Sequence, residues 1–437
     1  MNKFFNKNII FYLWMLLPLT YVIGILITET FVLLLTLYFL FKNRKFQIYK
    51  NKIFLFFLTT SIYIGINGFI NIPHNDLLIS SIFHFRFSLL IITIFFFIDY
   101  LENQEIVINT IFLKIILFIL CFIFFDALLQ FILGKNLFGY EIKNYARISG
   151  IFGTELILGS FFIKLLPYML WLIFFFKFDI ENKKFFLVFF FSIYFIIIYL
   201  SGERTSFALM FLSIVISAFF INKIKDIFLT SFGILVLFII LTNTLKIGKA
   251  NPYDRLINKT FNQITNQIFI KNKDNRNTFK KENSYDQVKD NLVLFSKDHN
   301  GHYILAYKLF TDSPFFGVGP KGFRYHCRII DYDSEVGMCS THPHNIPVQI
   351  LSELGILGML FYIYGFFFII RNLIYYYNKN DISEKDKYCF IAATISLIIN
   401  FFPFLPSGNF FNNWISINNF FYIGIYFYSY NKISNKI

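Results

Sequence analysis

Long apolar stretches, separated by short charged segments, make up most of the 437-residue chain. Many approach the roughly 20 residues that a helix needs to cross a bilayer, and none alternates like a barrel strand. Because a backbone in lipid must satisfy its own hydrogen bonds, we expect helices. The pattern predicts an all-α polytopic membrane protein with about twelve transmembrane helices. The expected spans are 9–25, 28–41, 53–70, 82–98, 107–133, 154–176, 185–201, 204–221, 227–244, 346–370, 388–405 and 413–430.

Composition supports this class, since 56% of residues are hydrophobic and only 15% are charged. A soluble domain would carry about a quarter charged residues. The expected organisation is one membrane domain, with helices one to nine in 1–244, an outer loop with amphipathic helices at 245–345, and three last helices in 346–437.

The placement of Lys and Arg predicts the orientation of the chain. With the N-terminus inside, the cytoplasmic segments hold 18 basic residues and the short outer segments hold three. By the positive-inside rule both termini are cytoplasmic, and the long loop 245–345 lies on the other side regardless of its charge. One cytoplasmic segment, 99–106, has three acids and no base. The net charge of +14 is divided between these anchors and the outer loop, which argues against a nucleic-acid partner.

Three arginines gather near the outer ends of the expected helices: Arg86, Arg147 and Arg204. A guanidinium matches phosphate geometry with paired hydrogen bonds, so these residues suggest a site for a lipid-linked pyrophosphate. The alternative is that each arginine pairs with a carboxylate and holds helices together, with Glu203 as the neighbour of Arg204.

The sequence of the second half of the outer loop predicts an amphipathic helix followed by a glycine-rich segment. HNGHYILAYKLFTDSP is typical of an amphipathic helix that ends at Asp312, and the glycines of FFGVGPKGF allow a close backbone approach to a ligand. His344 then stands at the start of the tenth span, where free backbone N–H groups attract anions. Gln349 and Glu353 share one face of that helix.

Cys327 and Cys339 lie in the same outer loop. An oxidising compartment would allow them to form a disulfide, and the alternative is two free thiols.

These residues resemble a known family. His344-Asn345, nine residues, Gly355, two residues and Gly358 are similar to the H-N-x9-G-x-x-G signature of the O-antigen ligase superfamily, which includes O-antigen ligases, O-antigen polymerases and bacterial O-oligosaccharyltransferases. DSPFFGVGPKGF and SGERTSF look like two further segments of that family.

The resemblance implies a C-type glycosyltransferase-like membrane fold that uses no metal or other cofactor. It implies transfer of a glycan, with inversion, from undecaprenyl pyrophosphate to a glycan or lipid A-core acceptor, on the periplasmic side of the bacterial inner membrane. Arg204 would bind the pyrophosphate, and His344 would act as base on the acceptor hydroxyl or orient the phosphate.

The chain departs from the family at one place. Where family ligases carry a second loop arginine, this chain has His302, which is positive at neutral pH only beside a strong anion. Arg324 is the alternative source of that charge. The expected substrate-binding residues are His302, Arg324, Lys321, Arg147, Arg86 and Asn345. Polymerase, ligase and oligosaccharyltransferase all remain open, with a slight preference for polymerase from His302.

Two other classes compete with a transferase. A transporter or flippase of lipid-linked glycan would also have many spans, but it needs no large asymmetric outer loop and often shows internal repeats. A zinc site could use the loop histidines, but His342 and His344 are poorly spaced for one metal on a helix.

Overall fold

The computed structural model describes residues 20, 24–42, 50–72, 75–102, 106–142, 146–263, 265, 297–329 and 340–434. Within these ranges every regular element is a helix and no strand occurs. The principal helices are α2 (Ile25–Lys42), α3 (Lys52–Asn71), α4 (Asn75–Ile82), α5 (Phe85–Glu102), α6 (Ile106–Leu133), α7 (Leu158–Phe175), α8 (Lys184–Leu200), α9 (Arg204–Phe220), α10 (Asn222–Thr244), α13 (Lys297–Asp312), α14 (Gly322–Ile329), α15 (Ile346–Tyr377), α16 (Glu384–Asn400) and α17 (Asn413–Ile433). Two short turns of helix are η2 (Gly150–Phe152) and η3 (Asp254–Asn258).

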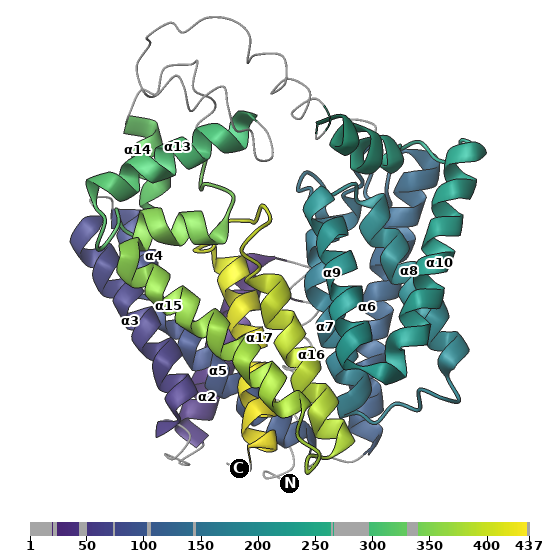
Figure 1. The fold of residues 1–437 in the computed structure, drawn as a ribbon, viewed down its shortest axis with the longest axis horizontal. Coiled ribbons are helices and arrows are strands. Elements are labelled where there is room, and N and C mark those ends of the chain that lie inside the picture. Colours follow the sequence, from purple (N-terminus) through teal and green to yellow (C-terminus); the bar gives the residue numbers. More distant parts are fainter. Residues whose placement is uncertain are drawn as a thin grey trace, which may run out of the picture.

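The helices form two groups joined by the last two (Figure 1). One group holds α6 to α10, and the other holds α2 to α5 with α15. α16 packs along α7, α17 packs along α5, and the two also pack on each other. The C-terminal pair therefore links the groups, while α13 and α14 lie at one end of the molecule.

In the part of the chain that the structure describes, six helices are long and apolar enough to cross a membrane: Lys52–Asn71, Leu77–Glu102, Ile111–Leu133, Leu158–Phe175, Asn222–Thr244 and Ile346–Tyr377. Leu26–Tyr38, Lys184–Leu200 and Arg204–Phe220 are shorter apolar helices. The all-helical membrane class is thus supported, and the count of twelve stays a prediction. The expected span 9–25 lies almost wholly outside the described residues.

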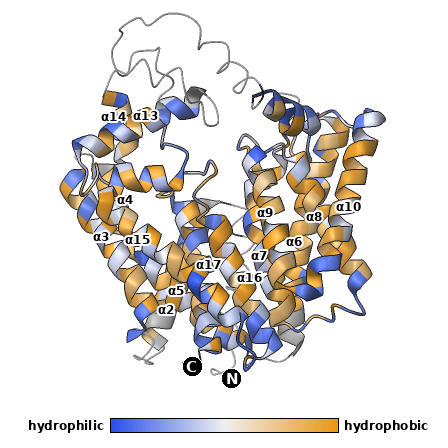
Figure 2. Ribbon diagram, in the orientation of Figure 1, coloured by the Kyte–Doolittle hydropathy of each residue, from blue (hydrophilic) through white to orange (hydrophobic). Residues whose placement is uncertain are grey.

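The last two expected spans correspond to α16 and α17, which are less apolar than the six (Figure 2). Most of their side chains are buried between other helices, so polar groups can pair inside the protein. Asn418 Nδ2, for example, donates to Asn400 Oδ1 at 2.7 Å. A helix shielded from lipid does not need a uniformly apolar surface.

α15 is kinked at Gly355, whose backbone has φ 65° and ψ −165°. The kink frees backbone groups that pair with the glycine-rich segment preceding α14. Ile356 N donates to the Pro314 carbonyl at 2.8 Å, and Val318 N donates to the Ser352 carbonyl at 3.1 Å. The loop segment is therefore hydrogen-bonded along the break in the helix.

The glycines at this contact have a different role from the one expected. A Cβ on Gly317 would lie 2.4 Å from the carbonyl carbon of Glu353, and one on Gly355 would lie 2.4 Å from that of Phe315. Gly319 N donates to the Glu353 carbonyl at 2.9 Å. Gly317 and Gly355 thus allow two backbone segments to touch, and the close approach predicted for a ligand is made by α15 itself.

Glu353 is fully buried beside the kink and organises its surroundings. Its Oε1 accepts from Phe323 N at 3.0 Å, at the start of α14, where a negative charge is favoured. Its Oε2 accepts from Gln349 Nε2 at 3.0 Å, so the shared face predicted for these two residues is confirmed. Gln349 Nε2 also donates to Asn409 Oδ1 at 2.8 Å, and Gln349 Oε1 accepts from Phe410 N at 2.9 Å.

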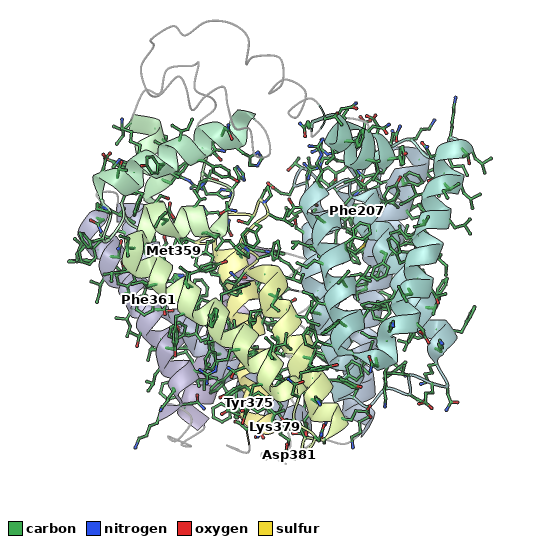
Figure 3. All side chains as sticks on the ribbon, viewed as in Figure 1. Phe207, Met359, Phe361, Tyr375, Lys379 and Asp381 are labelled. Atoms are coloured by element: carbon green, nitrogen blue, oxygen red, sulfur yellow. The ribbon has the colours of Figure 1, made fainter. Side chains whose placement is uncertain are left out.

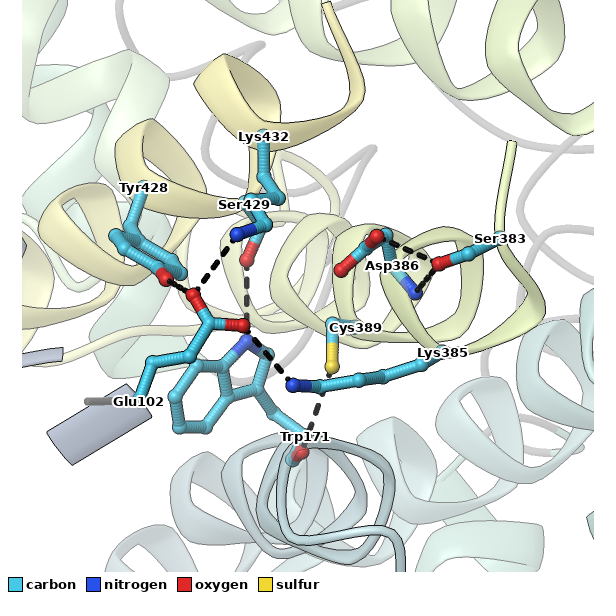
Figure 4. A network of polar contacts seen from close by, with 9 residues as sticks. All are labelled: Glu102, Trp171, Ser383, Lys385, Asp386, Cys389, Tyr428, Ser429 and Lys432. Atoms are coloured by element: carbon cyan, nitrogen blue, oxygen red, sulfur yellow. Dashed lines mark hydrogen bonds and ion pairs between the residues drawn. The ribbon is translucent and has the colours of Figure 1, made fainter. Parts of the chain in front are cut away.

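A second polar network lies at the opposite end of the helices (Figure 4). Glu102 at the end of α5 accepts hydrogen bonds from Tyr428, from Lys432 at 2.9 Å and from Lys385 at 3.0 Å. The acidic segment 99–106 thus supplies a carboxylate to lysines of two other segments expected to be cytoplasmic. At this end Lys379 lies over the Tyr375 ring, 5.1 Å from its centre (Figure 3).

Replacing Gly355 with alanine should destabilise the protein by about 3 kcal/mol, because its backbone conformation is essentially restricted to glycine and a Cβ meets backbone. A lower apparent melting temperature in detergent, followed by tryptophan fluorescence, would show this. Gly233→Ala is the matched control, since Gly233 lies inside α10 with no atom within 4 Å of the added Cβ. An equal melting temperature for both variants would contradict the interpretation.

Candidate active site

His344 occupies the turn that leads into α15. Its backbone is in the left-handed region, with φ 58°, which is unusual for a side-chain-bearing residue and often marks a functional site. The next residue, Asn345, is the N-cap: its Oδ1 accepts from Val348 N at 3.2 Å and its Nδ2 donates to the Pro403 carbonyl at 2.9 Å. These contacts show that Asn345 caps α15, and its predicted role in substrate binding stays a prediction.

Three other histidines surround His344. Ring centres lie 4.0 Å away for His342, 5.2 Å for His302 and 5.5 Å for His299. The structure therefore brings His302 of α13 next to His344 although they are 42 positions apart in the sequence. The four residues are called the histidine cluster below.

Hydrogen bonds from the α16–α17 loop hold part of this cluster. His342 Nε2 donates to the Ser407 carbonyl at 3.1 Å, so its Nδ1 accepts from the Thr341 hydroxyl at 2.9 Å. Ser407 N donates back to the His344 carbonyl at 2.8 Å. His344 Nε2 lies 3.1 Å from Ser340 Oγ.

Two members of the histidine cluster, His342 and His344, have lowered pKa values. Burial, followed by the nearby His302 and His299, lowers the pKa of His344 to about 4. Burial and His344 lower the pKa of His342 to about 3. His344 is consequently neutral at pH 7, and a neutral imidazole can accept a proton.

A small apolar core positions α13 and α14 above the start of α15. Leu305, Leu309 and Phe323 are buried together, and Cys327 packs with them. The predicted amphipathic helix is confirmed as Lys297–Asp312. Cys327 is disulfide-bonded, but Cys339 lies outside the described residues, so their pairing stays a prediction.

Lys321 and Arg324 lie near Arg86 beside this core. Burial first, then the positive charges of Arg324 and Arg86, lower the pKa of Lys321, whose Nζ donates to Ser80 Oγ at 2.8 Å. Arg324 Nε is buried and has no hydrogen-bond partner in the described structure. Arg86, by contrast, pairs with Glu29 at 3.4 Å, which favours the structural alternative for that arginine.

Arg204 and Arg147 lie in the other helix group, together with Arg255. Arg204 Nε donates to the Arg255 carbonyl at 3.2 Å, and Arg255 Nε donates to the Gly202 carbonyl at 3.0 Å. Arg147 Nη2 donates to the Leu156 carbonyl at 2.8 Å, while its buried Nε has no hydrogen-bond partner among the described residues. We call Arg147, Arg204 and Arg255 the arginine group.

Glu203 does not pair with Arg204 by hydrogen bonding; it caps α7. It accepts from Gly159 N at 2.8 Å, from Ser160 N at 3.1 Å and from the Ser160 hydroxyl at 2.5 Å. Burial raises its pKa, against the effects of Ser160 and of the Arg147 charge. No side chain of the arginine group forms an ion pair within 4.0 Å in the described ranges.

The predicted single basic cluster is thus divided between two helix groups. α9 carries Arg204 in one, and α13 to α15 carry the histidine cluster in the other, while η3 and α13 lie at the same end of the molecule (Figure 1). Sequence analysis missed Arg255 because it follows the ninth span in a long loop whose contacts have no local signature. In the described residues no group of three or more His, Cys, Asp or Glu side chains is placed to hold a metal ion.

The fold and site define a helical membrane protein with histidine and arginine side chains at one end of its bundle. Residues 187–363 match the protein family described as O-Antigen ligase. This segment runs from α8 into α15, and it confirms the resemblance to the O-antigen ligase and polymerase superfamily. It supports a membrane glycosyltransferase of that general type. No curated protein and no solved structure gave a match.

Replacing Glu203 with alanine should destabilise the protein by about 2 kcal/mol, because the first amides of α7 lose their acceptor. Glu203→Gln should cost less, since an amide oxygen still accepts. Melting temperatures in detergent test the order, with Glu181→Ala as control because Glu181 is exposed. Equal values for Glu203→Ala and the control would contradict the capping role.

Proposed function

We propose that the protein transfers or polymerises a glycan from undecaprenyl pyrophosphate on the periplasmic side of the membrane, without a metal and with inversion. The observation that carries the proposal is His344, a neutral imidazole held in a left-handed turn at the start of α15. Arg324 of α14 lies close enough to the cluster to lower the pKa of His342, and the arginine group of the other helix group carries further positive charge. These are the two requirements of the chemistry: a proton acceptor and charge for a departing pyrophosphate.

The arginine group supports a pyrophosphate site. Its guanidinium groups donate to backbone carbonyls and to Gln263 rather than to carboxylates, so their positive charge is not neutralised by an ion pair in the described structure. Arg147 Nε and Arg324 Nε are buried donors without partners. Preorganised cations of this kind stabilise the charge that develops on a leaving phosphate.

In the proposed reaction an acceptor hydroxyl displaces the lipid pyrophosphate from the glycan. The acceptor hydroxyl attacks the anomeric carbon of the glycan, and its proton passes to His344. The bond from that carbon to the phosphate oxygen breaks, so the pair of electrons leaves with the lipid pyrophosphate. Attack from the opposite face inverts the anomeric configuration. His302, 5.2 Å from His344 between ring centres, can donate a ring N–H to a phosphate oxygen.

The acceptor can be another repeat unit, a lipid A-core or a protein. The arrangement of His344 and the arginines is compatible with each, because it acts on the donor and on one hydroxyl. A flippase would use none of this proton-transfer geometry, and the family match favours the transferase over it.

Loss of the base or of a phosphate-binding cation should slow transfer strongly. With purified protein and an undecaprenyl-pyrophosphate-linked repeat unit, His344→Ala should lower kcat about 10²–10⁴-fold and Arg204→Ala about 10²–10³-fold. Arg255→Ala should also slow transfer. Products are followed by gel and mass spectrometry, where ladders indicate a polymerase and single additions a ligase.

The control for these variants is Arg371→Ala, because Arg371 is an exposed arginine in the last part of α15, beyond the kink. It should retain wild-type transfer. If His344→Ala and Arg204→Ala also retain it, the proposed site is wrong.

The pH dependence should reflect the low pKa of His344. The acid limb of kcat/KM, which reports the free enzyme, should lie near pH 4 rather than at 6.5. Because the folded pKa is depressed, the neutral form contributes stability above pH 6.5, and this contribution is lost as the pH falls through about 4. An acid limb at or above pH 6.5 would contradict a buried neutral base.

A further inference from the structure

A partly open pocket runs along α15 past its kink, lined by side chains of α3, α15, α16 and α17 and by His84. It begins at Ile350 and Leu354 and continues along α15 past Phe361 to Ile369. Figure 3 labels Phe361 on this stretch of α15. The lining is almost entirely apolar. The cavity is separate from the histidine cluster and from the arginine group, none of whose residues line it.

Most polar side chains of the lining are already satisfied. The Thr60 hydroxyl donates to the Phe56 carbonyl at 2.9 Å, and the Tyr362 hydroxyl donates to the Phe401 carbonyl at 2.6 Å. The Ser416 hydroxyl donates to a backbone carbonyl at 3.3 Å.

His84 and Asn419 are the exceptions. Both nitrogens of His84 and the Oδ1 of Asn419 are buried without a hydrogen-bond partner in the described structure. His84 is 4% exposed and Asn419 is 2% exposed. The His84 ring is held among Phe87, Phe411 and Phe420, with ring centres 5.2, 6.2 and 5.8 Å away.

Unpaired polar atoms of this kind are costly, and buried groups in native proteins are nearly always hydrogen-bonded. A neutral imidazole offers one donor and one acceptor, and the Asn419 oxygen offers an acceptor. A hydroxyl complements this pair, since it can accept from the His84 N–H and donate to Asn419 Oδ1. A purely hydrocarbon ligand would leave all three atoms unsatisfied.

We propose that this cavity binds the chain of a membrane lipid that carries a hydroxyl group, with the hydroxyl held between His84 and Asn419. The bilayer is the source of the ligand, because the outer flanks of α3 and α15 are themselves lipid-compatible: Ile66 is 55% exposed and Phe367 is 71% exposed. The length of the cavity along α15 suits a linear chain. This site does not depend on the proposed transferase activity, and it adds a lipid-recognition element to the fold.

The test compares two photoreactive probes with the same diazirine, one built on tetradecanoic acid and one on 3-hydroxytetradecanoic acid. Purified wild-type protein in detergent is labelled with each, and the labelled peptides are mapped by mass spectrometry. The hydroxylated probe should label residues 350–369 on the order of fivefold more than the plain probe, as one buried hydrogen-bonding group predicts.

Two variants test whether His84 and Asn419 cause the preference for the hydroxylated probe. His84→Phe and Asn419→Leu should each bring the labelling ratio to about one while leaving plain-chain labelling intact. His326→Phe, which changes a histidine of α14 outside the cavity, should keep the wild-type ratio.

The wild-type comparison decides the proposal even if a variant fails to fold. Equal labelling by the two probes, or no labelling of 350–369 by either, overturns it, because the cavity then holds unselected chains or water. A preference that survives in both folded variants overturns it as well.

Discussion

The contact between the glycine-rich loop segment and the break in α15 determines the rest of the site. Gly355 adopts a conformation that interrupts the helix, and Gly317 presents bare backbone to the interrupted turn. The exposed amides and carbonyls of α15 are thereby satisfied by the loop instead of by the helix itself. In a membrane environment, unpaired backbone groups cost several kcal/mol, so the break and the loop segment stabilise each other.

That contact has consequences for both ends of the loop. It places Glu353 against the first amides of α14, and α14 packs with α13 over the start of α15. α13 in turn carries His302 to within 5.2 Å of His344, measured between ring centres. The histidine cluster is therefore positioned by the packing of apolar side chains and by one buried carboxylate.

The histidine cluster and the arginine group differ in their charge at neutral pH. Burial, followed by the charges of neighbouring histidines, lowers the pKa of His344 and of His342. Arginine stays charged under the same conditions. A neutral imidazole thus stands in the turn before α15, and guanidinium groups stand on α9 and η3. In the proposed reaction these would serve as the proton acceptor and as positive charge for the departing pyrophosphate.

The sequence alone determined the local features of this protein. Apolar segment length predicted membrane helices, amphipathic spacing predicted α13, and helix periodicity placed Gln349 beside Glu353. A motif of adjacent residues was enough to single out His344. Each of these depends on residues within a few turns of one another, where helix geometry alone sets the distances.

Only the tertiary structure decided which distant groups meet. It paired Arg86 with Glu29, gave Glu203 to the start of α7, and set Arg255 beside Arg204. It also turned the loop glycines from an expected ligand contact into a contact with α15. The physical reason is that a side chain's partner depends on how whole helices pack, and helical periodicity specifies which face is apolar but not which helix covers it.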